Sequence, residues 1–171
     1  MEIHYPLHAA AATCQLMTVR TTAPHPKREP IMADENPSIM SHVSLGTNDF
    51  PKAREFYLRV LSTLGCRIIM EHEGAAAFGK AYPEFWIQAP FDGAAASCGN
   101  GVHVGFLAQS KAEVEAFFKE AIAAGATEDG DPGHRHDYGE PYYGCFVRDL
   151  DGHKIEASFW DFELAAKLGM T

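Results

Sequence analysis

The sequence predicts an α+β protein of two successive βαβββ modules, and this expectation rests on an internal repeat, hydrophobic periodicity and an ordinary globular composition. Residues 38–92 and 100–163 each contain the pattern of a strand, a helix and three further strands. The first-strand histidines, His42 and His103, are 61 positions apart, as are the aromatic pairs of the two helices. A repeat of this length indicates two copies of one supersecondary unit that pack together.

The first module begins with a strand pattern over 38–46 and a helix pattern over 48–65. The helix carries its large apolar residues at the spacing of one buried face. Asn48 or Asp49 can cap its start, and Gly65 provides the left-handed residue at its end. Three short β segments follow, separated by glycine, alanine and proline: 66–73, 75–80 and 83–90.

The second module repeats this order. A strand is expected over 101–108 and an amphipathic helix over 110–125, and the remaining strand candidates are 126–131, 142–149 and 153–160. The last strands of the two modules contain WIQAP and KIEAS, and matching these stretches sets Gln88 opposite Glu156. The sequence thus predicts equivalent polar positions at the end of each module.

The domain is expected to cover 38–163. Residues 1–37 lack sustained periodicity and carry a Thr/Pro/basic stretch, so we expect a flexible extension. Met32 is a plausible alternative start, and residues 164–171 are expected to form a C-terminal tail.

Charge and composition exclude several classes of partner. The formal net charge of −9 disfavours nucleic acid and anionic lipid. No apolar stretch approaches the roughly 20 residues that a membrane-spanning helix requires. The four cysteines are scattered without a C-x-x-C pair, which favours reduced thiols. We therefore expect a soluble cytoplasmic protein that acts on a small molecule.

Two histidines and one carboxylate form the candidate metal site. His42 and His103 occupy equivalent first strands, and Glu156 lies in the last strand of the second module. Such a set suits divalent iron, manganese, zinc or nickel and leaves positions open for substrate. Each residue also has an ordinary structural explanation. Either histidine could be a half-buried strand residue that binds no metal. Glu156 could be a solvent-exposed edge residue, because Lys154 and Ser158 share its strand face.

A polar segment over 133–143 is expected to form a loop near the site. His134, His136 and Tyr138 titrate or donate hydrogen bonds, so they are candidates for substrate contact or proton transfer. A solvated loop is the alternative interpretation.

Four motifs carry a family resemblance: H-V-S-L at His42, A-R-E-F-Y over 53–57, G-V-H-V at His103, and Y-Y-G-C-F-V-R-D-L-D-G-H-K-I-E-A over 142–157. Over roughly residues 40–161 they resemble the vicinal oxygen chelate superfamily, also called the glyoxalase, bleomycin-resistance and dioxygenase family. The resemblance implies paired βαβββ modules that curl into a cup, with a metal held by His42, Gln88, His103 and Glu156.

The resemblance also implies several activities. The first is a glyoxalase I-like lyase or isomerase in which Glu156 acts as base, with glutathione as a possible co-substrate. Gln88 departs from the glutamate that bacterial glyoxalase I enzymes place there, and this departure looks more like extradiol dioxygenases or fosfomycin-resistance thiol transferases. A metal-free binding protein similar to bleomycin-resistance proteins is the third alternative. The two modules pair within one chain or across a homodimer.

Overall fold

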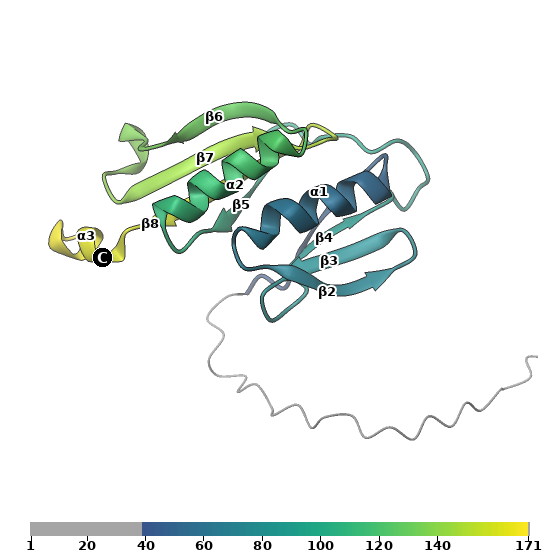
Figure 1. Cartoon of the computed structure of the whole chain (residues 1–171), viewed down its shortest axis with the longest axis horizontal. Coiled ribbons are helices and arrows are strands. Elements are labelled where there is room, and N and C mark those ends of the chain that lie inside the picture. The colour runs from purple at the N-terminus through teal and green to yellow at the C-terminus, as the bar shows by residue number, and fades with distance from the viewer. Residues whose placement is uncertain (1–38, 171) are drawn as a thin grey trace, which may run out of the picture. The chain divides into compact units, whose positions relative to one another are not determined.

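The computed structural model describes residues 39–170 and confirms the two predicted βαβββ modules (Figure 1). The predicted extension, residues 1–37, lies outside the described residues. The first module contains β1 (Val43–Gly46), α1 (Phe50–Ser62), β2 (Arg67–His72), β3 (Ala75–Gly79) and β4 (Phe85–Gln88). Its strands form one sheet in the order β1-β4-β3-β2.

The second module has the same topology. It contains β5 (His103–Leu107), α2 (Lys111–Ala123), β6 (Thr127–Gly133), β7 (Tyr142–Arg148) and β8 (Lys154–Trp160), and its sheet order is β5-β8-β7-β6. In both sheets the first strand runs parallel to the last strand, whereas the other neighbours are antiparallel. A short 3₁₀ helix, η1 (His136–Tyr138), joins β6 to β7.

Local capping fixes where the two long helices begin and end. The Asp49 carboxylate accepts a hydrogen bond from the Lys52 N–H at 3.2 Å, and the Ser110 hydroxyl accepts one from the Glu113 N–H at 3.2 Å. These caps satisfy N–H groups that have no partner inside the helix. Gly65, with φ of 77°, follows the first helix in the left-handed conformation that the sequence predicted.

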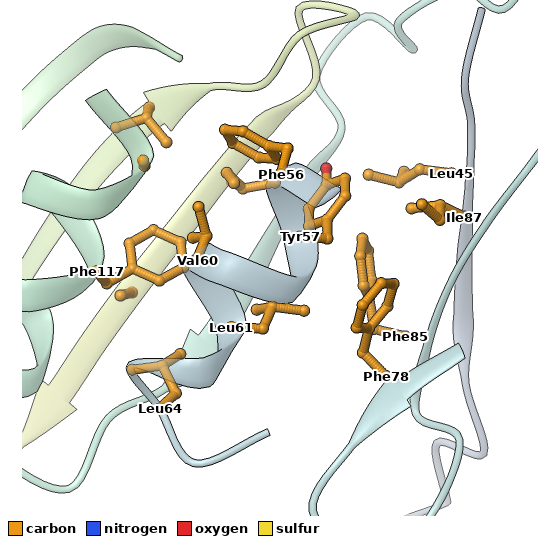
Figure 2. Close-up of a cluster of buried hydrophobic side chains, with 14 of the residues drawn as sticks. Leu45, Phe56, Tyr57, Val60, Leu61, Leu64, Phe78, Phe85, Ile87 and Phe117 are labelled. Atoms are coloured by element: carbon orange, nitrogen blue, oxygen red, sulfur yellow. The ribbon is translucent and has the colours of Figure 1, made fainter. Parts of the chain in front are cut away.

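The two helices share one apolar core (Figure 2). Helix α1 contacts β2, β3 and β4, α2 contacts β6, β7 and β8, and the helices also contact each other. From α1, Phe56, Tyr57, Val60 and Leu61 are at most 2% exposed, and Phe117 of α2 is fully buried in the same cluster. Burial of each such side chain contributes about 1.5–3 kcal/mol.

Buried polar groups connect α1 and the end of β1 with the turn between β7 and β8. The Tyr57 hydroxyl donates to the Asp149 carboxylate, which also accepts from the His153 N–H at 2.7 Å. The His153 side chain bonds the Gly46 carbonyl oxygen through Nε2 at 2.8 Å. Because unpartnered buried polar groups are costly, these bonds fix the contact between the modules.

The strand faces that point away from the helices carry the polar candidates. On β5, Val104 and Phe106 pack against the core, whereas His103, Gly105 and Leu107 are exposed. Strands β1 and β5 each have only one strand neighbour within the described residues, so both are sheet edges. Leu107 is 78% exposed on one such edge.

The structure adds a helix where the sequence analysis expected a tail. Helix α3 (Phe162–Lys167) is capped by the Asp161 carboxylate, which accepts from the Leu164 N–H at 2.9 Å. Ala165 is fully buried, so this segment belongs to the folded unit. None of the helices formed by residues 39–170 is long and apolar enough to cross a membrane.

Candidate metal centre

Two of the predicted ligands meet on the face of the second sheet that points away from α2. Because β5 and β8 run parallel, with His103 paired to Lys154 and Gly105 to Glu156, the imidazole and the carboxylate are diagonal neighbours. His103 Nε2 lies 3.2 Å from Glu156 Oε2. A Cβ added to Gly105 would lie 3.4 Å from the same oxygen, so glycine leaves that side of the carboxylate open.

Tyr142 is the third member of this cluster, and the sequence analysis missed it. Its hydroxyl donates to Glu156 Oε1 at 2.7 Å. Burial, the hydrogen bond to Glu156 and the charge of that carboxylate raise the pKa of Tyr142 well above its ordinary value, so the phenol stays a donor. Gly144 lies beneath the phenol, where any side chain would overlap the hydroxyl. The Tyr142-Tyr143-Gly144 stretch at the start of β7 was the sequence signal that could have identified this phenol.

The carboxylate of Glu156 is buried but fully partnered. Its side chain is 11% exposed, against 49% for His103. A buried carboxylate without partners costs several kcal/mol, and here each of the two oxygens has one partner. The alternative interpretation of Glu156 as a solvent-exposed edge residue is therefore wrong, because the neighbouring strands and Tyr142 cover it.

The donor atoms of His103 and Glu156 fit two ligands of one divalent ion. Ligands about 2.1 Å from a shared ion lie roughly 3.0–3.4 Å apart in octahedral or tetrahedral geometry. The observed separation of 3.2 Å falls in this range. Tyr142 would then be the outer hydrogen-bond partner that orients the ligating carboxylate.

His42 does not join this pair within one chain. It precedes β1, is exposed, and its Nδ1 lies 3.2 Å from the Ser41 hydroxyl. Among residues 39–170, no group of three His, Cys, Asp or Glu side chains is close enough to hold a metal ion. The expected convergence of His42, His103 and Glu156 is therefore absent from the single chain.

The strand register corrects the predicted equivalence of Gln88 and Glu156. Trp86 pairs with Ser44, two residues after His42, whereas Glu156 pairs with Gly105, two residues after His103. Trp86 is thus the residue of the first module that corresponds to Glu156. Gln88 corresponds to Ser158, since the N–H of the residue after each first strand bonds their carbonyl oxygens.

Gln88 lies instead beside a cavity under the connection between the modules. The cavity has a volume of about 290 Å³ and is lined by Ser44, Leu45, Gly46, Gln88, Pro90, Asp92, Ala95, Ala96 and Ser97. A ligand role for Gln88 stays a prediction, but it no longer follows from the repeat.

The 133–143 segment contributes unequally to the site. The Tyr138 ring packs edge-on against Tyr142 with centroids 4.9 Å apart, so it supports the phenol that holds Glu156. His134 lies toward α2, where its Nε2 is 3.2 Å from Lys111 Nζ. His136 is exposed at the start of η1, and its catalytic role stays a prediction.

The fold agrees with the family comparisons. The profile of the Glyoxalase/Bleomycin resistance protein/Dioxygenase superfamily matches residues 39–157, so the chain belongs to this superfamily. No functionally curated protein matches it.

Solved structures support the same assignment. A glyoxalase/bleomycin resistance protein from Albidiferax ferrireducens T118 is 35% identical, with a TM-score of 0.66 over 72% of this chain and 100% of its own. A family enzyme from Burkholderia phytofirmans PsJN is 20% identical, with a TM-score of 0.58 over 71% of this chain and 98% of its own. The fosfomycin resistance protein FosX from Listeria monocytogenes is 20% identical, with a TM-score of 0.55 over 74% and 96% of the two chains. The last two share the fold.

Proposed function

We propose that this chain is a metal-dependent enzyme that acts on a small substrate with two neighbouring oxygen atoms, as a glyoxalase I-like lyase or isomerase. The contact of His103 Nε2 with Glu156 Oε2, backed by Tyr142, is the observation that carries the proposal. A divalent ion held there (zinc, nickel, iron or manganese) would polarise the substrate oxygens and stabilise the charge that develops on them.

The residues of the chain supply the proton chemistry in this proposal. Glu156 takes a proton from the carbon beside the substrate carbonyl and returns it to the neighbouring carbon. Tyr142 keeps its hydrogen bond to Oε1, which leaves Oε2 directed at the open side of the cluster. A hemithioacetal formed with glutathione is one substrate of this kind.

We further propose that His42 of the partner subunit completes the ligand set in a homodimer. His42 lies directly before the β1 edge strand and His103 begins the β5 edge strand, and both are exposed. An isologous pairing of the β1 edge of one copy with the β5 edge of the other would create two identical sites. The exposed Val102 and Leu107 on the second edge supply apolar surface for this contact.

A second candidate function is favoured by Trp86. With an indole in place of a second carboxylate, the ligand set reduces to two histidines and Glu156. Such a set suits an iron-dependent dioxygenase or a thiol transferase as well as an isomerase. A metal-free binding protein is the remaining alternative. A cytoplasmic location is part of the proposal, and the free thiols of Cys66, Cys98 and Cys145 support it.

Metal analysis and turnover separate these functions. Nickel or zinc, together with turnover of methylglyoxal and glutathione, is expected for the isomerase. Iron with oxygen uptake on catechols would favour the dioxygenase instead. Purified protein that contains no metal and stays inactive after metal addition would favour the metal-free binding protein.

Coexpression of two defective variants tests the shared site. His42→Ala and Glu156→Ala chains should each lose metal, but random pairing of the two yields mixed dimers with one intact site, about a quarter of all sites. The matched control combines His103→Ala with Glu156→Ala, which damages both sites of every mixed dimer. Equal metal content in the two mixtures would contradict sharing between subunits.

A further inference from the structure

Arg135 is a cation on the site face without a carboxylate partner among the described residues. The six ion pairs formed by residues 39–170 do not include it. Its guanidinium donates only to backbone oxygens, from Nη1 to His134 at 3.1 Å and from Nη2 to Asp131 at 2.7 Å. Because a guanidinium carries five N–H donors, part of its hydrogen-bonding capacity remains for a ligand.

The guanidinium lies in a place that the backbone shapes for it. Its Cζ lies 5.6 Å from the centroid of the Phe146 ring, within range of a cation–π contact. On β6, a Cβ added to Gly130 or Gly133 would come within 3.2 Å of Nη2 or Nη1, respectively. The two glycines leave the room that the planar group occupies, and its two backbone hydrogen bonds and the Phe146 ring hold it there.

This place adjoins the candidate metal centre. Phe146 pairs directly with Glu156 across β7 and β8, and its ring packs edge-on against His103 with centroids 6.3 Å apart. The cation therefore lies one aromatic ring away from the reacting groups and on the same sheet face. The charge of Arg135 also partly offsets the pKa rise of Tyr142 that burial and Glu156 cause.

The other cations near this place share one carboxylate. Lys154 Nζ lies 4.4 Å from the centroid of the Phe146 ring but also 3.2 Å from Asp129 Oδ2. Arg148 Nε lies 3.0 Å from the same carboxylate. Arg135 is thus the cation of this face that has no carboxylate partner among the described residues, in a chain of net charge −9.

We propose that Arg135 is the anion-binding group of this site, and that the substrate is a small molecule with a carboxylate, phosphate or phosphonate group. The planar fork of a guanidinium matches two oxygens of such a group. While Arg135 holds the anionic end, the reacting end of the substrate lies against His103 and Glu156. This last placement rests on the proposed function, whereas anion binding by Arg135 does not require the metal.

Calorimetric titration of the metal-free full-length protein tests the proposal. The probes are propanoate, inorganic phosphate and the neutral control propanamide, each at low and high ionic strength. At least one of the two anions should bind and propanamide should not, and preference between the anions identifies the chemical group. Arg135→Gln should weaken anion binding by tenfold or more, and Arg135→Lys, which keeps the charge without the fork, by less.

The control variant is Arg148→Gln, which removes the same charge from an arginine that contacts Asp129, and it should bind anions as the wild type does. The folded state of each variant is checked by circular dichroism. Absence of anion binding to the wild type, full binding by Arg135→Gln, or an equal loss in Arg148→Gln would overturn the proposal. Anion binding through Arg135 in a protein that takes up no metal would refute the proposed function alone.

Discussion

The two modules share one strand topology but carry side chains of different chemistry at the same position of their last strands. In the second module, Glu156 bonds His103 and Tyr142. In the first module, the corresponding residue is Trp86, whose ring stacks on His72 with centroids 6.3 Å apart and an interplanar angle of 12°. The repeat therefore conserves strand register without conserving the site.

Neighbouring residues explain how each sheet accommodates its own side chain. Trp86 is paired with Ala77 on β3, and the small alanine leaves space for the indole to reach toward β2. Glu156 is paired with Phe146 on β7, and the Phe146 ring contacts the charged groups of Arg135 and Lys154. The first module thus offers one histidine and an aromatic surface, and the second offers a histidine with a carboxylate.

Glu156→Gln should produce the largest effect. The substitution keeps the shape but removes the charge that a divalent ion requires, so metal affinity should fall by about 100-fold or more. Elemental analysis after dialysis measures the loss. Because Gln keeps an acceptor for Tyr142, the metal-free fold should unfold at a similar or higher temperature than the wild type.

The matched change in the first module is Trp86→Ala. Loss of a half-buried indole should lower the free energy of unfolding by about 1–3 kcal/mol, while metal content stays unchanged. Urea denaturation gives the first quantity and elemental analysis the second. Full metal occupancy in Glu156→Gln, or metal loss in Trp86→Ala, would contradict the assignment of the metal site to the second module.

Tyr142→Phe should have an intermediate effect. It leaves the buried Oε1 of Glu156 without its donor, which costs about 1–3 kcal/mol of folding stability. If Tyr142 orients a ligating carboxylate, metal affinity should also fall about 10–100-fold, since outer partners of ligands have effects of that size. A stability loss without any change in metal affinity would reduce Tyr142 to a purely structural residue.

The last expected effect is a pH dependence to which the buried thiol of Cys145 in the second module contributes. Cys145 faces α2 where the first module has Ala76, and burial raises the pKa of its thiol from 9.0 to about 11. Because the folded-state pKa is raised, the stabilisation is complete below pH 9 and is lost as pH rises toward about 11. The slope from one such group reaches about 1.4 kcal/mol per pH unit.

Melting temperatures of the wild type and Cys145→Ala between pH 8 and 11, under reducing conditions, measure this difference. The wild type should lose stability more steeply, and the difference between the two curves removes the shared contribution of the buried tyrosines. Parallel curves would show that the thiol does not titrate in this range.

Sequence similarity misled the alignment of the two last strands. WIQAP and KIEAS have Ile and Ala at the same positions, but the true equivalence is shifted by two residues and sets Trp86 against Glu156. A shift of two keeps every side chain on the same strand face, so alternation of apolar residues does not reveal it. Only the hydrogen-bonded pairing with β1 and β5 fixes the register.

The sequence by itself determined the elements, because caps, glycine stops and apolar periodicity act over a few neighbouring residues. It also placed His103 and Glu156 on the first and last strands of the second module, and the structure pairs these strands. Tertiary structure decided which groups meet: the Tyr142 phenol reaches Glu156 over Gly144, and Arg135 lies over Phe146. It also left His42 apart from His103, because the distance between side chains of different modules depends on how the modules pack, which neither module's own pattern encodes.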